Sequence, residues 1–401
     1  METSLEKKLT HLGLLIITLI YFRTTIGVIL GSVVADLVIV STIILLPAFI
    51  FLIFRRQVYG HRKTVFFYIV YCFLAFLITP LSSEYGSYFG GFIGLTNLVF
   101  LVVFWLVLLS YRNMEDNIQK FAGLFLIIGG VNAVGAIIQS TISIDLFGLV
   151  SHGVYTNEQV LANENVNVRA VSFISSPQSL ALFLSFCLCL SFSYDWRRQS
   201  LKYFTRGLLF FAGVLTVSKV FFVFIFFYIL FSYLSPRKII KLFFSVVLFF
   251  TILLFFKEHL GRVFEMINIL ENIESYSAFI IWSDSFKYAI QFPEVIFGHG
   301  VGVFSRGSQS LLNYQLLYGS TESFFIQVLA EIGIIGLVFL LSLTFSAVKK
   351  YYAYDRRLMG LLSAFFIVGF FTPALYGYTI GMSFYFTLLL PLVSKRTNIE
   401  K

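Results

Sequence analysis

The chain has 401 residues, of which 58% are hydrophobic, 19% aromatic and only 12% charged. Charged residues are about half as frequent as in an ordinary globular domain, so the chain cannot cover itself with polar surface. A soluble monomer, a collagen, a disordered protein and a disulfide scaffold are excluded, and an all-α, polytopic membrane protein is predicted. The formal net charge of +9 fits a lipid bilayer as partner and requires no nucleic acid, because membrane proteins collect Lys and Arg on cytoplasmic loops.

Apolar runs divide the chain into predicted spans, each needing about 20 residues to cross about 30 Å. The polar segment 1–10 carries no cleavable signal pattern, so the first run is predicted to be a retained helix. The long runs lie near residues 9–30, 33–54, 64–80, 91–110, 121–142, 176–194, 239–256, 323–347, 358–375 and 376–393. The stretch 207–234 is ambiguous, because Ser218 and Lys219 interrupt it near its middle.

Basic clusters decide how this stretch is divided. Twenty-two of the 29 Lys and Arg residues fall in seven clusters along the chain. All seven clusters are cytoplasmic only if two membrane crossings separate each cluster from the next, so the stretch 207–234 must cross twice. We therefore predict two short helices, about 207–217 and 220–234, with a turn at Ser218–Lys219. The prediction is a single domain over residues 1–401 with about twelve transmembrane helices and both termini cytoplasmic.

Two predicted extracytoplasmic loops, about 143–175 and 257–321, are too long to be simple connections. Seven basic residues remain outside the clusters, in these loops or in the outer half of the predicted spans. They are Arg23, Arg169, Lys219, Lys257, Arg262, Lys287 and Arg306. Cations held there against the positive-inside tendency are candidates for binding an anion. Arg169, Lys219, Arg262 and Arg306 are the stronger candidates, because the others have a nearby acidic residue.

Two carboxylates stand in one apolar stretch, STESFFIQVLAEIGIIGLVFLL. Glu322 is at its outer start, where it is either an ordinary acid at a helix N-terminus or a base that faces a cavity. Glu331 lies nine residues further, about 13.5 Å deeper, where an ionised carboxylate is costly. A paired or protonated structural group is the favoured interpretation of Glu331.

Metal and nucleotide sites are not indicated. His299 lies in the glycine-rich segment GHGVGVF, which no strand precedes, so a dinucleotide-binding motif is excluded. No Walker motif and no Asp-x-Asp pair is present, which favours a metal-free reaction without a cofactor. Cys72, Cys187 and Cys189 lie in apolar runs and are predicted to be buried rather than bridged.

Four stretches, taken in order, resemble the O-antigen polymerase (Wzy-type) and O-antigen ligase superfamily of bacterial membrane glycosyltransferases. They are Arg169 with AVSFISSPQSLALFL, LTVSKVFFVFIFF with Lys219 at the position of a family Arg, the loop PEVIFGHGVGVF, and TESFFIQVLAEIGIIGLVFLL. The family often has an Arg about four residues before a Trp ahead of the loop; here Ala278 precedes Trp282, and Arg262 lies sixteen residues before Ala278. Ligases usually begin the last stretch with His-Asn, whereas polymerases often have Glu or another polar residue, as Glu322 here.

The resemblance implies a GT-C-like, metal-independent glycosyltransferase in the bacterial cytoplasmic (inner) membrane. Such a polymerase transfers a growing glycan from its undecaprenyl diphosphate onto another lipid-linked repeat unit, and so builds O-antigen or capsular polysaccharide. The implied roles are diphosphate binding by Arg169, Lys219, Arg306 and Arg262, and catalysis by Glu322 or His299 as base. A polysaccharide chain-length regulator is an expected partner.

Two alternatives stay open from the sequence. Within the superfamily, the chain could be an O-antigen ligase, which the absence of a His-Asn pair disfavours. From another class, it could be a flippase or transporter of lipid-linked oligosaccharides. A transporter is expected to have ionisable residues deep in the bundle and short outer loops, whereas here most non-cytoplasmic charge lies in two long outer loops.

Overall fold

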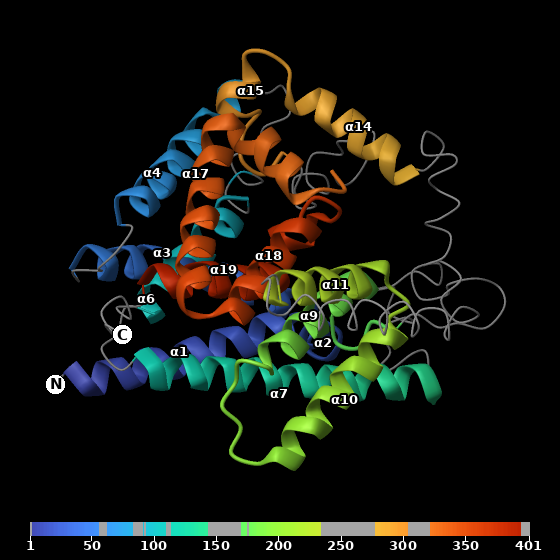
Figure 1. Cartoon of the computed structure of the whole chain (residues 1–401). Coiled ribbons are helices and arrows are strands. Elements are labelled where there is room, and N and C mark those ends of the chain that lie inside the picture. Colours follow the sequence, from blue (N-terminus) through green and yellow to red (C-terminus); the bar gives the residue numbers. More distant parts are fainter. Residues whose placement is uncertain are drawn as a thin grey trace. The chain divides into compact units, whose positions relative to one another are not determined.

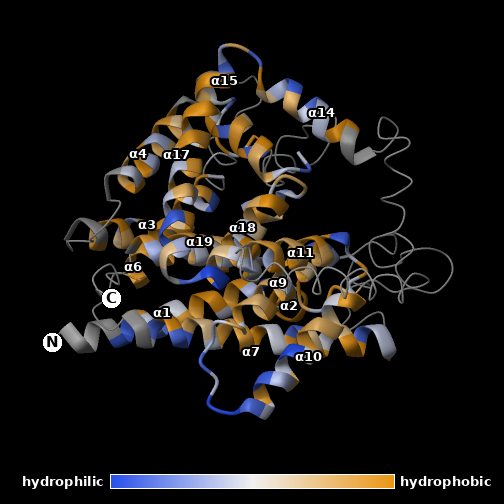
Figure 2. Ribbon diagram, in the orientation of Figure 1, coloured by the Kyte–Doolittle hydropathy of each residue, from blue (hydrophilic) through white to orange (hydrophobic). Residues whose placement is uncertain are grey.

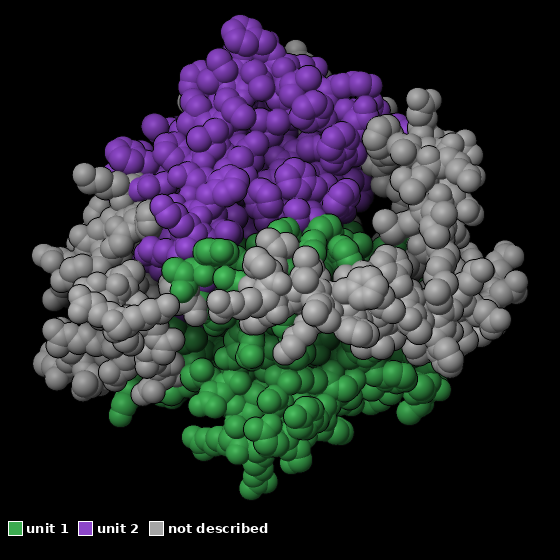
Figure 3. Space-filling model, viewed as in Figure 1, with its two compact units in different colours: residues 1–41, 111–268, 352–365 green, residues 42–110, 269–351, 366–401 purple. Residues whose placement is uncertain are grey.

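The computed structural model describes residues 2–55, 62–82, 91, 94–109, 114–142, 170–174, 176–233, 277–303 and 321–393. Every regular element within these ranges is a helix (Figure 1), as the composition predicts. Two compact units are present, made of residues 1–41, 111–268 and 352–365, and of residues 42–110, 269–351 and 366–401 (Figure 3). We call them unit 1 and unit 2 and describe each by itself.

Unit 1 is built around the long helix α7, which packs against α1, α9 and α10, while α9 also packs against α11. Its first two helices are separated at Phe22 and bent by 69° relative to each other. The helices of this unit are α1 (Glu2–Tyr21), α2 (Arg23–Leu30), α7 (Met114–Thr141), α9 (Pro177–Leu190), α10 (Gln199–Leu215) and α11 (Lys219–Tyr233).

Unit 2 has a helical core in which α19 packs against α6. The indole of Trp105 in α6 donates to the Met382 carbonyl of α19 at 2.9 Å, and the Tyr351 hydroxyl donates to the Thr387 carbonyl at 2.9 Å. The elements of this unit are α4 (Arg62–Ser82), the π-helix η1 (Thr96–Phe100), α6 (Leu101–Leu109), α14 (Ser277–Ala289), α15 (Glu294–Phe297), α17 (Phe324–Tyr354), the 3₁₀-helix η5 (Pro373–Tyr376) and α19 (Tyr378–Val393). Three helices have residues in both units: α3 (Ser32–Arg55), α18 (Arg356–Val368) and α17, whose last three residues belong to unit 1.

Local sequence explains where several helices begin. The Ser176 hydroxyl accepts a hydrogen bond from the Ser179 N–H at 3.1 Å, and Pro177 occupies the first helical position of α9. Proline is suited to that position because its missing N–H would have no partner there. At α18, the Asp355 carboxylate accepts from the N–H groups of Arg357 and Leu358 in the same way.

Helices occupy all the predicted spans that fall on described residues, and most of the residues in these helices are hydrophobic (Figure 2). Among the described residues, Asn117–Thr141 and Phe324–Ala353 are the helices long and apolar enough to cross a membrane, with the bent pair α1–α2 as a third candidate. The other apolar helical stretches, such as Val40–Leu52 within α3 and Thr64–Leu77 within α4, have 10–17 residues. A helical stretch of that length rises at most about 26 Å, less than the bilayer core. The all-α class is thus confirmed for the described residues, whereas the single domain and the twelve spans stay predictions.

Parts of the prediction lie outside the described residues. The predicted span 239–256 is one of them, together with most of the long loops 143–175 and 257–321. Within the second loop the structure describes residues 277–303, which contain α14 and α15. The three cysteines are buried and free of disulfides, as predicted.

Candidate functional site

A helix break in unit 1 carries the first candidate site residue. Helix α10 ends at Leu215 and α11 begins at Lys219, which confirms the break predicted at Ser218–Lys219. Lys219 is half-buried at the N-terminus of a 15-residue helix, where backbone N–H groups point outward and the helix dipole is positive. The lysine and the helix end together make a positive site.

The geometry of the break follows from the residues around it. Thr216 closes α10, because its N–H donates to the Gly213 and Val214 carbonyls. Val217 then adopts a left-handed conformation with φ of 47°, which is uncommon for a β-branched residue. A side chain at Gly213 would overlap the ring of Phe221, so this glycine allows the two helices to approach closely.

A second segment, residues 170–174, is fastened to the same break. The Ala170 N–H donates at 3.2 Å to the carbonyl of Leu215, the last residue of α10. The buried side-chain oxygen of Gln139 in α7 accepts from the N–H groups of Val171 and Ser172 at 2.8 and 2.9 Å. Arg169 directly precedes this segment in the chain and lies outside the described residues.

Unit 2 contains the glycine-rich segment, residues 298–303, which docks on a kink in α17. The kink is at Gly333, with φ of 65° and ψ of −175°. A kink removes helical partners from the preceding carbonyls, and other groups of the unit bind these carbonyls. The N–H groups of His299 and Gly300 donate to the carbonyls of Ala330 and Glu331 at 2.7 and 3.2 Å. The Tyr71 hydroxyl donates to the next carbonyl, that of Ile332, at 2.9 Å.

Glycines allow this docking because the two backbones touch. A Cβ at Gly333 would overlap the Ile296 carbonyl, and a Cβ at Gly298 would overlap the backbone of Glu331. Gly298, Gly300 and Gly302 also have positive φ, which glycine adopts without a steric penalty. The glycine pattern is therefore explained by packing against α17.

The Glu331 carboxylate completes the docking. It is fully buried and accepts from the Gly302 N–H at 3.0 Å, from the Gln327 side-chain amide at 3.2 Å and from the Tyr376 hydroxyl. A buried carboxylate is tolerated when its oxygens are hydrogen-bonded. Glu331 is thus paired through hydrogen bonds, as the sequence predicts, and its structural role stays a prediction.

His299 is held inside the same cluster. Its ring is stacked on Tyr288 with 3.9 Å between centroids, and Nε2 donates to the Tyr288 carbonyl at 2.8 Å. Burial lowers the pKa of His299 below its ordinary value of 6.5, against a smaller opposing contribution from the hydrogen bond to Tyr288. A neutral imidazole with Nε2 engaged keeps only Nδ1 as an acceptor.

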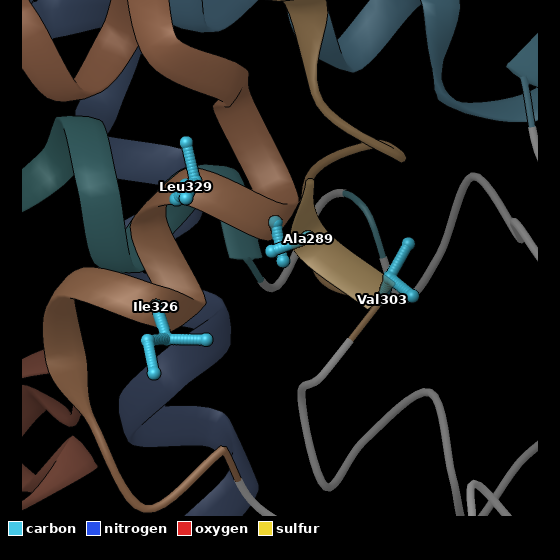
Figure 4. Close-up of a cluster of buried hydrophobic side chains, with 5 residues drawn as sticks. Ala289, Val303, Ile326 and Leu329 are labelled. Atoms are coloured by element: carbon cyan, nitrogen blue, oxygen red, sulfur yellow. The ribbon is translucent and has the colours of Figure 1, made fainter. Parts of the chain in front are cut away.

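An apolar cluster anchors the segments that flank the glycines. Ala289 at the end of α14 and Val303 after the glycines pack with Ile326 and Leu329 of α17 (Figure 4). The two α17 residues are three positions apart and thus on one helix face. The cluster supports the glycine segment from the side of α14.

Glu322 lies at the start of α17 in a left-handed conformation, with φ of 54°. Glu322 is half-buried between two buried neighbours, Thr321 and Ser323. The Thr321 hydroxyl donates to the Ser323 carbonyl at 2.7 Å. The Phe324 N–H donates to the carbonyls of Gly369 and Thr372, which fixes the helix end. The neighbours thus hold the Glu322 backbone in a conformation that an isolated glutamate disfavours.

Backbone strain coincides with the stretches that the sequence singles out. Among the described residues, the non-glycine residues with positive φ are Ser172, Val217 and Glu322. Such conformations cost about 1–3 kcal/mol each and cluster at functional sites. Val217 lies in the break of unit 1, Ser172 lies in the segment bonded to that break, and Glu322 in unit 2 is the base predicted from the sequence.

The remaining predicted site residues, Arg169, Arg262 and Arg306, lie outside the described residues. Within the part of the chain that is described, no three His, Cys, Asp or Glu side chains are placed to hold a metal ion. The structure brings His299 to the kink beside Glu331, whereas Glu322 precedes α17, nine residues before Glu331 in the chain.

Sequence reasoning missed the partners that hold these segments. Gln139 and Gln327 are polar residues inside apolar helices, a signal that could have identified them. Tyr71 and Tyr376 gave no such signal, because tyrosine is also frequent at membrane interfaces.

Comparisons of the chain with family models, with curated proteins and with solved structures found no match.

Proposed function

We propose that this protein is a membrane glycosyltransferase that joins oligosaccharide repeat units carried on a lipid diphosphate, as a polysaccharide polymerase. The proposal rests on the order of four sequence stretches that resemble the O-antigen polymerase and ligase superfamily. Apolar helices able to cross a membrane support the setting in a bilayer. In this proposal the reaction takes place at the outer face of the cytoplasmic membrane.

The observation that carries the proposal is the break between α10 and α11. A helix N-terminus with Lys219 as its first residue favours a phosphate group, through backbone N–H groups, the helix dipole and the ammonium charge. The segment that follows Arg169 is bonded to the same break through Ala170. Two stretches for which the sequence predicts a role in diphosphate binding are thus joined by a hydrogen bond.

The proposed reaction needs negative charge to be stabilised on the leaving group. The acceptor hydroxyl oxygen attacks the anomeric carbon of the donor sugar, and the bond from that carbon to the diphosphate oxygen breaks. The diphosphate leaves on its lipid with the electron pair, where Lys219 and Arg169, with Arg306 and Arg262, stabilise it. Arginine suits this role because its guanidinium binds phosphate oxygens in pairs.

Glu322 is the proposed base that takes the proton of the acceptor hydroxyl. Its half-buried position and its constrained backbone support this choice. The stacked and hydrogen-bonded ring of His299 is less available, so we place it second.

Incubation of the purified chain with lipid-linked repeat units tests the proposal. A ladder of product lengths identifies a polymerase. A single product on a different acceptor identifies a ligase, and transfer across a vesicle without a new bond identifies a transporter.

Variants test the roles in the same assay. We expect Lys219→Ala to lower the rate of chain extension by about 10²- to 10³-fold, as loss of one charge-stabilising group does, and Lys219→Arg to retain part of it. Lys287→Ala is the matched control, because Lys287 is exposed and pairs with Asp284 at 3.2 Å on a helix surface. If a folded Lys219→Ala protein extends glycan chains at the wild-type rate, Lys219 has no role in the mechanism. The same result with Glu322→Gln would exclude Glu322 as the base.

A further inference from the structure

An open groove of about 800 Å³ runs along α7 and α10 in unit 1. Its α7 wall extends from Gly123 to Ile138, which corresponds to about 22 Å along a helix. One leaflet of a bilayer core is about 15 Å thick, so the groove is long enough to hold an acyl chain of one leaflet.

The lining of the groove is apolar along most of its length and includes three glycines of α7. Ile127 and Phe204 on its two sides are 66% and 68% exposed. At Gly130 a Cβ would meet no atom within 4 Å, so the space above this glycine is open. Large apolar side chains exposed along a groove mark a surface that another apolar molecule covers.

The charged residues that line the groove are two arginines at one end of it. Arg197 and Arg198 line it and are exposed, next to Trp196 and Tyr194. Figure 2 shows the connection into α10 as a hydrophilic stretch between apolar helices. Trp and Tyr are enriched at the level of lipid headgroups, and basic clusters mark the cytoplasmic side.

The charge at this end is not used to stabilise the helix that follows it. Arg198 is the N-cap of α10 and makes no side-chain capping bond, and a cation at a helix N-terminus is unfavourable next to the helix dipole. By contrast, the neighbouring Arg206 donates to the Ser191 carbonyl at the end of α9 at 2.8 Å, and Arg357 donates to the Phe192 carbonyl at 2.6 Å. Arg197 and Arg198 together with the helix end thus form a site that an anion would stabilise.

We propose that this groove binds an anionic glycerophospholipid of the cytoplasmic leaflet. Its acyl chain lies along α7 and α10, and its phosphate is held by Arg197, Arg198 and the N-terminus of α10. The complementarity between a basic end and an apolar trough of acyl length carries this proposal, which does not depend on the glycosyl transfer proposed above.

Native mass spectrometry of the full-length protein in detergent tests this proposal. The probes are dioleoyl phosphatidylglycerol and dioleoyl phosphatidylcholine, which have the same acyl chains and differ in headgroup charge. We expect the anionic lipid to bind at least tenfold more tightly, and Arg197→Ala/Arg198→Ala to reduce its affinity by about 20- to 30-fold. The matched control is Lys7→Ala/Lys8→Ala, which removes two exposed cations elsewhere in the same unit.

A second pair of variants tests the groove itself. Gly130→Leu should fill the trough and weaken both lipids, while Gly207→Leu, whose Cβ also meets open space but lies outside the groove lining, should not. Equal affinity for the two lipids, or full binding by the Arg197→Ala/Arg198→Ala or Gly130→Leu protein, would overturn the proposal. Displacement of the bound phospholipid by a polyprenyl phosphate would instead assign the groove to a substrate tail.

Discussion

The glycine segment of unit 2 and the helix break of unit 1 are both interruptions of apolar helices, and they differ in how their polar groups are used. At the glycine segment, the carbonyls exposed by the Gly333 kink and the buried carboxylate of Glu331 all have hydrogen-bond partners within unit 2. At the break, strained residues and a half-buried lysine stand at a helix N-terminus. The polar groups of the glycine segment bind one another within unit 2, whereas at the break a cationic side chain, a helix N-terminus and strained residues stand together, which is the arrangement proposed to bind the diphosphate.

The largest effect that this comparison predicts is on stability. Gly333→Ala places a Cβ at positive φ and against the Ile296 carbonyl, which cannot move as a flexible side chain can. We expect the free energy of unfolding to fall by about 4 kcal/mol or more. Thermal unfolding in detergent measures it, with Gly207→Ala as control. Gly207 lies in α10, in open space, so alanine there should stabilise the helix by about 1 kcal/mol. Equal melting of Gly333→Ala and wild type would show that the docking is not tight.

The next effect concerns the buried carboxylate. Glu331→Ala removes the acceptor of the Gly302 N–H, the Gln327 amide and the Tyr376 hydroxyl, and should cost about 3 kcal/mol. Glu331→Gln keeps one acceptor oxygen and should cost less. Glu294→Ala, in the short helix α15, should change stability by less than about 0.5 kcal/mol. The stated role of Glu331 is refuted if Glu331→Ala and Glu294→Ala unfold alike.

At the break, we expect Gln139→Ala to lower stability less than the two preceding variants and to lower activity more than its effect on stability explains. Gln139→Ala leaves the N–H groups of Val171 and Ser172 without an acceptor, at a cost of about 2 kcal/mol. If the segment after Arg169 binds the diphosphate, chain extension should fall further than the loss of folded protein explains. Ser140→Ala is the control, because that hydroxyl bonds only the Ala136 carbonyl of its own helix. Parallel losses of folded protein and activity would separate Gln139 from the proposed site.

Local features were predictable from the sequence, and long-range partners were not. The break before Lys219 followed from Ser218 and Lys219 inside an apolar run and from the distribution of basic clusters, and a helix over α9 followed from the apolar run near residues 176–194. Docking of the glycine segment on α17 joins His299 to Ala330, thirty-one residues apart, and Tyr71 to Ile332 across most of the chain. Periodicity carries no information about such pairs, so the sequence did not predict that the glycine segment docks on α17.

The number of spans depends on features that hydropathy does not contain, and the twelve crossings stay a prediction. Helix α9 ends after 14 residues at Ser191, whose N–H donates to the Cys187 carbonyl, although the apolar run continues to about residue 194. A cap of this kind ends a regular helix inside an apolar run, so the length of the run does not by itself give the length of the helix.

The smallest effect expected is a pH dependence that arises from His299. Because burial lowers its pKa in the folded protein below the ordinary 6.5, the unfolded chain binds a proton at a pH where the folded protein does not. Stability should therefore be complete above about pH 6.5 and decrease as the pH falls from there through the lowered pKa. In His299→Gln, an amide can still donate to the Tyr288 carbonyl and does not titrate. Subtracting the pH profiles of thermal unfolding of the two proteins isolates this histidine from the other four. A flat difference would mean that His299 is protonated as readily in the folded protein as in the unfolded chain, and so would leave it free to act as a base.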